Sequence, residues 1–175
     1  MRLQLLTSKT EAAEVVKKFK ARVEAESGKK LRMVLTDRGG EFTSVEFAAY
    51  YTDQGVVRHH TAPYAPQQNG VVERRNQTVV GMTQSMMKAK SMPAKFWGEA
   101  MTTAVFILNR APTKALKGKT PSEAWYGRKL SVSFLWTFSC ISHVRKTKPV
   151  LTKLEDRSTP MVLLSYEEGT KAYVA

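Results

Sequence analysis

Cysteine and histidine are scarce in this sequence, and their scarcity excludes several classes of protein. The 175 residues contain a single cysteine, Cys140, and three histidines. One cysteine cannot form an internal disulfide, which fits a reducing compartment. A zinc-binding His/Cys module needs more ligands than the chain offers, and Cys140 with His143 as a C-x-x-H pair lacks the remaining ones.

Long apolar runs and acidic residues are also few. No stretch approaches the roughly 20 apolar residues that span a bilayer, and residues 1–4 do not open a signal peptide. We therefore expect a soluble, intracellular protein without a membrane partner. Lys and Arg number 28 against 15 Asp and Glu, which gives a net charge of +13. Such an excess favours a polyanionic partner, although a basic protein without any nucleic-acid role stays open on charge alone.

Helix and strand patterns alternate through the first third of the chain. Residues 3–6 are predicted to form a short strand, and Ser8 with Glu11 forms a capping box that opens a helix ending at Gly28. The solvated face of this helix is predicted to carry Lys17, Lys18, Lys20, Arg22 and Glu24. Residues 30–36 follow as a buried strand, so the alternation predicts an α/β layer architecture.

A second helix and strand follow in the same way. Thr43 with Glu46 forms another capping box, and the helix that it opens turns Phe47, Ala48 and Tyr51 inward and ends at Gly55. Residues 56–60 are predicted to form the next strand. Its adjacent histidines, His59 and His60, point to opposite faces and cannot readily bind one metal ion together, so a structural role or a phosphate contact is favoured.

The region from 61 to 90 is predicted to be a loop followed by a helix. Pro63 and Pro66 punctuate the loop, and Asn69 is a good N-cap for a helix that reaches about residue 90. The buried stripe is predicted to consist of Val72, Val79, Met82 and Met86. Glu73 lies at the margin of that stripe in the first turn, where the helix dipole favours a carboxylate.

The rest of the chain contains two helices and a run of short strands. Pro93 begins a helix whose core stripe is Trp97, Ala100, Met101, Ala104, Val105 and Leu108. Thr120 to Glu123 combine an N-cap, a proline at the first helical position and a capping-box glutamate, and Gly127 ends this short helix. Strands are predicted at residues 135–138, 141–144, 161–166 and 172–174.

Two carboxylates stand out against this background. Asp37 follows directly on the predicted strand 30–36, and Gly39 and Gly40 let the backbone turn away so that the carboxylate stays at the strand end. Glu73 opens a later helix. One carboxylate at a strand end and one on a helix can converge on a divalent cation, as in-line phosphoryl transfer requires, but two acids alone are a weak signal.

The residues around these acids strengthen the signal. Residues 36–42 (TDRGGEF) and 61–74 (TAPYAPQQNGVVER) resemble the integrase core of copia-type LTR retrotransposons, DDE-type polynucleotidyl transferases with an RNase H-like fold. The resemblance continues through residues 96–100, 108–113 and 120–127, and so covers nearly the whole chain. It implies an α/β fold: a partial RNase H-like, retroviral integrase-type core followed by a small, incomplete SH3-like β-barrel.

The resemblance also implies catalytic roles. Asp37 would be the second acid of the triad and Glu73 the third, both binding Mg²⁺ or Mn²⁺. The first acid belongs on an upstream strand that this chain lacks, so we expect weak metal binding and no activity from this polypeptide alone. The DNA-binding residues would be Gln67, Gln68, Asn69, Arg74, Arg75, Gln77 and Lys88. The partners would be element DNA ends and target DNA, with a possible homo-oligomer, and the family implies a nuclear location.

The implied domains are 1–112 for the catalytic core without its first strands, 113–130 for a linker and short helix, and 131–175 for a truncated SH3-like β domain. The family usually has glycine where Ser139 and Ser165 stand, so both turns are expected to be distorted. Two alternatives remain open. One is a catalytically dead, nucleic-acid-binding remnant of a retroelement polyprotein, and the other is an RNase H-like resolvase or transposase of a different lineage.

Overall fold

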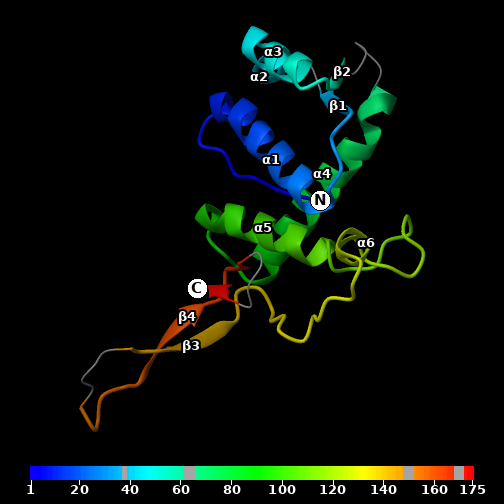
Figure 1. Cartoon of the computed structure of the whole chain (residues 1–175). Helices are drawn as coiled ribbons and strands as arrows, with labels where there is room; N and C mark the ends of the chain where they lie inside the picture. The colour runs from blue at the N-terminus through cyan, green and yellow to red at the C-terminus, as the bar shows by residue number, and fades with distance from the viewer. Residues whose placement is uncertain (37–38, 61–65, 148–151, 168–171) are drawn as a thin grey trace. The chain divides into compact units, whose positions relative to one another are not determined.

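The computed structural model describes residues 1–36, 39–60, 66–147, 152–167 and 172–175 (Figure 1). These residues divide into two units. The N-terminal unit is Gln4–Asn76, and the C-terminal unit combines Met1–Leu3 with Gln77–Ala175. Helix α4 (Pro66–Ala89) contributes residues to both units. The domain boundary proposed at 113–130 stays a prediction.

The first helix forms where the sequence predicts it, after a single tight turn. Ser8 caps the 3-10 helix η1 (Lys9–Glu11) by accepting a hydrogen bond from the Thr10 N–H, and α1 (Ala12–Ser27) follows. Gly28 ends α1 in the left-handed conformation, with φ of 66°, and its N–H returns to the Glu24 carbonyl. A residue with a Cβ would be strained there, so the glycine is a true C-terminal stop.

The sheet of the N-terminal unit consists of two parallel strands. β1 (Met33–Thr36) pairs with β2 (Val57–His60), in a register that places Met33 beside Val57 and Thr36 beside His60. The prediction of a strand at residues 3–6 is wrong, because these residues have no strand assignment. A short extended segment is stable only when its N–H and C=O groups pair with a neighbouring strand, and β1 and β2 pair only with each other among the described residues.

Two helices connect these strands and provide the core of the unit. α2 (Gly40–Thr43) follows β1, and α3 (Val45–Asp53) begins at Ser44, whose hydroxyl accepts from the Phe47 N–H. The predicted cap at Thr43 is therefore wrong by one residue. Phe47 and Tyr51 are fully buried as predicted, and they form a cluster with Val56 at the start of the second strand. Removing a buried aromatic ring of this kind typically costs about 3–5 kcal/mol.

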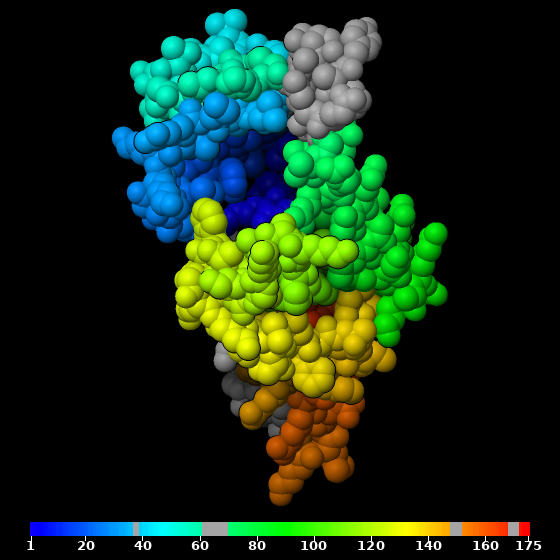
Figure 2. Space-filling view, turned by 90° about the vertical axis from the view of Figure 1, so that its right-hand side faces the viewer, coloured from blue at the N-terminus to red at the C-terminus, as the bar shows by residue number. Residues whose placement is uncertain are grey.

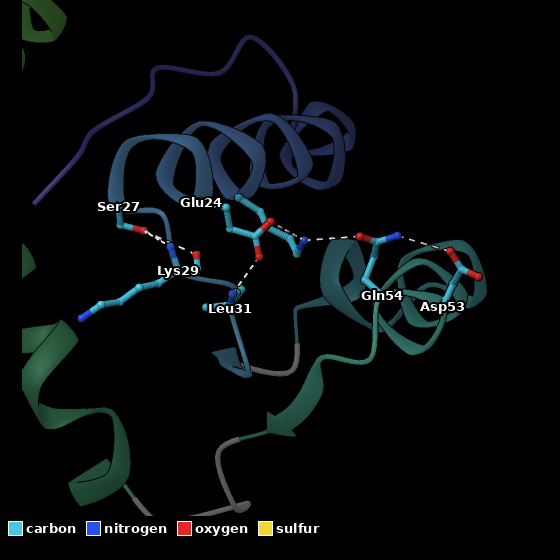
Figure 3. Close-up of polar contacts among 7 residues, drawn as sticks. Glu24, Ser27, Lys29, Leu31, Asp53 and Gln54 are labelled. Atoms are coloured by element: carbon cyan, nitrogen blue, oxygen red, sulfur yellow. Dashed lines mark hydrogen bonds and ion pairs between the residues drawn. The ribbon is translucent and has the colours of Figure 1, made fainter.

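One charged residue of α1 is buried against the prediction. Lys20 is only 7% exposed, while its apolar neighbour Phe19 is 44% exposed. The Lys20 ammonium donates to Glu24 at 2.9 Å and to the Gln54 side chain at 3.4 Å. The other Glu24 oxygen accepts from the backbone N–H of Leu31 at 2.7 Å, just before β1 (Figure 3). This network ties α1 both to the end of α3 and to the start of β1.

The C-terminal unit is built on α4 and α5 (Trp97–Leu108), with the 3-10 helix η2 (Ala94–Phe96) before α5. Its core cluster is Val79, Ala104 and Val105, as the helical spacing predicts. Two predicted core residues are instead at the surface, since Val72 is 50% and Trp97 is 53% exposed. Both lie near the beginning of their predicted stripes, and Val72 belongs to the part of α4 in the N-terminal unit.

The short helix α6 (Pro121–Tyr126) confirms its sequence signature in full. The Thr120 hydroxyl accepts from the Glu123 N–H, and the Glu123 carboxylate accepts from the Thr120 N–H at 2.8 Å. Gly127 ends the helix with φ of 68°. Each orphan donor at the helix start has a partner, which is why six residues suffice for a stable helix here.

The last part of the chain contains two antiparallel hairpin-like pairs. β3 (Ile141–Arg145) pairs with β4 (Ser158–Val162), and β5 (Ser165–Tyr166) pairs with β6 (Tyr173–Val174). The predicted strand at 135–138 is wrong, because these residues form turns and coil. The SH3-like barrel stays a prediction.

A stacked pair of aromatic rings packs β5 against α5. Phe106 on α5 stacks on Tyr166 with ring centroids 4.8 Å apart, and the Tyr166 hydroxyl donates to the Trp136 carbonyl at 2.6 Å. Thr103 is buried and donates to the Leu164 carbonyl. The serine predicted at a distorted turn, Ser139, has φ of 63°, a conformation that non-glycine residues adopt only with strain. Ser165, in contrast, lies within β5.

The Glu24 network generates a stability prediction. Glu24→Gln keeps an acceptor for the Leu31 N–H but leaves the buried Lys20 ammonium without a carboxylate, so we expect a lower urea midpoint at pH 7. The Lys20→Met/Glu24→Gln double variant removes both charges and should recover part of the loss. Glu14→Gln, which breaks the exposed pair between Glu14 and Lys18, is the control and should change little.

The same network predicts a pH dependence. The hydrogen bond from Lys20, together with that from the Leu31 N–H, holds the pKa of the Glu24 carboxyl below its usual 4.5. The stabilisation is therefore complete above about pH 4.5 and disappears as the pH falls further. The difference in urea midpoint between the natural protein and Glu24→Gln should shrink below that pH. A difference that stays constant to pH 3 would contradict this role.

Candidate metal and nucleic-acid site

The candidate site begins where β1 ends. The carboxyl ends of β1 and β2 lie side by side, since Thr36 pairs with His60, and parallel sheets tend to place functional groups at that edge. Asp37 follows Thr36 directly, but it lies outside the described residues together with Arg38. The structure therefore gives the strand from which Asp37 leaves the sheet, and not the position of its carboxylate.

A chain of hydrogen bonds runs along this edge. The Arg58 guanidinium on β2 donates to the Phe42 carbonyl at 2.6 Å and lies 3.3 Å from Nε2 of His60. Nδ1 of His60 lies 3.3 Å from the Thr36 hydroxyl. Because a guanidinium can only donate, Nε2 of His60 must accept, and the ring proton then lies on Nδ1 and points to Thr36.

These contacts hold described residues on both sides of Asp37 in the sequence. Thr36, on the upstream side, is held by the strand pairing and by His60, and Phe42 in α2, on the downstream side, is held by Arg58. The predicted structural role of His60 agrees with these contacts. The importance of Arg58 was missed from the sequence. Its only signal was the two-residue spacing from His60, which puts both side chains on one face of a strand.

Glu73 lies farther into its helix than predicted. α4 begins at Pro66 and has no acidic residue in its first turn, so Glu73 is about two turns from the helix start. The free N–H groups of the first turn are thus out of its reach, and the helix dipole supports a carboxylate less at this position than the prediction assumed. Glu73 is exposed and belongs to the same unit as β1.

The candidate nucleic-acid residues lie along α4. Gln67, Gln68 and Asn69 were predicted in a loop, with Asn69 as the N-cap; they are instead helical residues that follow Pro66, and the positions of their side chains lie outside the description. Pro66 explains the earlier start, since proline is well suited to the first turn of a helix. The other four candidates are exposed: Arg74 and Arg75 in the N-terminal unit, Gln77 and Lys88 in the C-terminal unit.

The donor set fits a hard divalent cation in chemistry. Mg²⁺ and Mn²⁺ prefer carboxylate oxygens. Glu73 is exposed, so its carboxylate can bind an ion without any rearrangement of the core. Within the described ranges, which omit Asp37, no group of three or more His, Cys, Asp or Glu side chains comes together as a metal site. Cys140 instead packs beside the Phe106 cluster, and Nδ1 of His143 lies 3.4 Å from the Ser158 hydroxyl.

Comparison with known proteins shows which sequences this chain is related to. No protein-family model matches it. The retrovirus-related Pol polyprotein from transposon TNT 1-94 of Nicotiana tabacum is 38% identical over 169 residues, which make up 97% of this chain and 13% of the polyprotein. The chain thus spans only a small part of the length of this relative.

Two solved structures share the fold. A chain of the simian T-cell lymphotropic virus intasome, solved in complex with PP2A regulatory subunit B56 gamma, matches with a TM-score of 0.54 and 19% identity, over 92% of this chain and 56% of that chain. The catalytic core domain of BIV integrase matches with a TM-score of 0.51 and 19% identity, over 72% and 76%. The expected α/β, RNase H-like core fold is confirmed.

The hydrogen-bonded edge makes a testable prediction. Arg58→Met should remove the donors to Phe42 and His60, and the loss of a charged hydrogen bond of this kind costs about 1.5–3 kcal/mol. Amide hydrogen exchange of Phe42 in α2 and of Thr36 should then be faster than in the natural protein. Arg58→Lys, which keeps one donor, should restore part of the protection.

Arg32→Met is the matched control, because Arg32 is exposed and precedes β1. Equal exchange rates in Arg58→Met and Arg32→Met would show that the Arg58 contacts do not hold this edge.

Proposed function

We propose that this chain, which is homologous to part of the Pol polyproteins of copia-type retrotransposons and has the integrase catalytic-core fold, is integrase sequence that serves to join element DNA ends to target DNA. Homology over 97% of the chain carries the proposal, since it includes the segments around both candidate acids. The whole polyproteins are several times longer, so the activity of the complete integrase is proposed here only for the larger protein that would contain this sequence.

Asp37 and Glu73 are the proposed metal ligands. A bound Mg²⁺ or Mn²⁺ would activate the attacking oxygen and stabilise the leaving one during phosphoryl transfer. The role of the protein is to hold the two carboxylates at the strand end and on α4. The Thr36–His60–Arg58–Phe42 contacts support this role, because they restrain residues that precede and follow Asp37 in the sequence.

The polypeptide of 175 residues carries two of the three acids that the family uses. Two carboxylates hold a hydrated divalent ion less tightly than three, so we propose that this chain alone binds the metal weakly and is inactive in strand transfer. A second candidate function is therefore a catalytically dead nucleic-acid-binding protein. The net charge of +13 supports that alternative, since charge alone provides nonspecific affinity for DNA.

The proposed partner is DNA, contacted along α4. Gln67, Gln68, Asn69, Arg74, Arg75, Gln77 and Lys88 would reach phosphates and sugars with cationic and amide donors. A homo-oligomer and a nuclear location are further proposals that rest on the family. In the part of the chain that the structure describes, no helix has the length and apolar character to cross a membrane.

Metal binding tests the proposal directly. Titration with Mn²⁺, followed by electron paramagnetic resonance of the free ion, should detect a weak site in the natural chain. Asp37→Asn and Glu73→Gln should each weaken it by about tenfold or more, since even an indirect partner of a metal ligand contributes tenfold. Glu46→Gln is the control, because Glu46 is an exposed helical glutamate in an ion pair with Lys17.

Unchanged Mn²⁺ affinity in both Asp37→Asn and Glu73→Gln would refute the metal site. Joining of labelled element-end DNA to a plasmid by the purified chain would refute the proposed inactivity.

Duplex binding tests the role of α4. We expect Arg74→Gln to reduce affinity for duplex DNA and to lower the slope of log K against log salt by about 0.9, the value for one phosphate contact. Lys18→Gln removes the same charge from an exposed position on α1 and should leave the slope nearly unchanged. Equal changes in both variants would mean that α4 is no special DNA surface.

A further inference from the structure

A second group of basic residues flanks α6 and includes none of the residues assigned above. Five exposed cations flank the helix on both sides, and we call this set, together with Trp125 and Tyr126, the α6 surface. The cations are Lys114, Lys117, Lys119, Arg128 and Lys129. Within the described part of the chain, none of them forms an ion pair.

The local charge is not neutralised by acids of the same segment. Glu123 is the only acid between residues 114 and 129, and its carboxylate accepts the hydrogen bond that caps α6. Most cations on α1 have a different environment, since Lys17, Lys18, Lys20 and Arg22 all pair with glutamates. The α6 surface therefore carries an unscreened positive charge on a short stretch of chain.

The surface is held in a defined shape. The Ser122 N–H donates to the Asn109 carbonyl at the end of α5, and Ser122 itself is buried. Turns in the preceding loop are closed by hydrogen bonds from the N–H of Leu116 to Thr113 and from the N–H of Lys119 to Leu116. Because this backbone is already ordered, a ligand would not have to bear the entropic cost of ordering it.

Two large aromatic side chains lie exposed among these cations. Trp125 is 47% and Tyr126 is 52% exposed, and both lie in the last turn of α6. Figure 2 shows the yellow-green segment around α6 on the face toward the viewer. An apolar protein partner would have to desolvate five cations to cover these rings, at a high cost. A single-stranded nucleic acid can use both features, because its phosphates contact cations and its unpaired bases stack on aromatic rings.

We propose that the α6 surface binds single-stranded nucleic acid, with Lys114, Lys117, Lys119, Arg128 and Lys129 contacting phosphates and Trp125 stacking on an unpaired base. In a duplex the base faces are covered by their neighbours, so Trp125 contributes to single-strand binding only. This inference deepens the nucleic-acid binding proposed above, but it requires neither the metal site nor α4.

The test compares a fluorescent oligothymidylate with a duplex of the same length, by anisotropy. Trp125→Leu should lower the affinity for the single strand about tenfold and leave duplex affinity within about twofold. Trp136→Leu is the matched control, because Trp136 is 64% exposed and has no charged residue within five positions on either side. Thermal unfolding by circular dichroism verifies that each variant is folded.

The cations are tested by a matched pair of triple variants. Replacing Lys114, Lys117 and Lys119 by glutamine should reduce the slope of log K against log salt for the oligothymidylate by about 2, at roughly 0.7 per contact. Replacing Lys9, Lys29 and Lys30, which are also exposed, removes the same charge elsewhere and should have a small effect.

A third measurement needs no change at the site. In a Trp97→Phe/Trp136→Phe variant, Trp125 is the only tryptophan, and oligothymidylate should quench its fluorescence at the same concentrations that saturate the anisotropy.

Several results would overturn the proposal. One is that oligothymidylate does not quench the fluorescence of Trp125. Others are equal salt slopes in the two triple variants, or an equal loss of single-strand and duplex affinity in Trp125→Leu. Displacement of the oligothymidylate by polyglutamate at equal charge concentration would also overturn it, by showing that any polyanion, including an acidic protein, is bound equally. Because Arg74→Gln and Mn²⁺ titration report on other residues, failure here is distinguishable from failure of the proposed integrase function.

Discussion

The parallel pairing of β1 with β2 is the constraint on which the candidate site depends. It places Thr36 beside His60, and so determines where the chain leaves the sheet before Asp37. The pairing is supported from both ends. Glu24 accepts from the Leu31 N–H before β1 begins, while His60 contacts Thr36 before Asp37 and Arg58 contacts Phe42 after it. Without this pairing, the position of Thr36 would not be fixed, and neither would the point from which the chain continues to Asp37.

The sequence predicted those features that depend on neighbouring residues in the chain. The capping box of α6 and the glycine stop of α1 follow from local hydrogen bonds and backbone conformation, and both formed as expected. The burial of Phe47 and Tyr51 also followed from helical spacing. Local chemistry thus determines much of the helical part of the fold, and the family resemblance was sufficient for the fold class.

Most of the features that the sequence did not predict depend on contacts between distant residues. Lys20 was assigned to solvent because nothing local shows that Gln54, which is 34 residues away, will contact it. Asn69 is a favourable cap, yet α4 begins at Pro66, so Glu73 lies well inside the helix. Arg58 carries no motif, and only the folded strand brings it to the Phe42 carbonyl. For the site itself, residue types were predictable and their supporting contacts were not.

Positive charge serves different purposes in different parts of this chain. On α1 it is largely neutralised by glutamates and contributes to structure, whereas around α6 it remains available for a polyanion beside two exposed rings. Net charge alone would not have distinguished these cases. The distinction comes from which carboxylates are within reach, and it is the reason why we propose nucleic-acid contacts around α6 and not on α1.

The central claim is that the carboxylates of Asp37 and Glu73 share one divalent ion. Paramagnetic broadening of amide resonances during a Mn²⁺ titration of isotope-labelled protein tests this most directly. We expect the amides of Thr36 and Gly39, which flank residues 37 and 38, and of Glu73 on α4 to broaden together, with one common dissociation constant. Broadening at only one of the two places, or with two different constants, would contradict a shared ion and with it the proposed integrase chemistry.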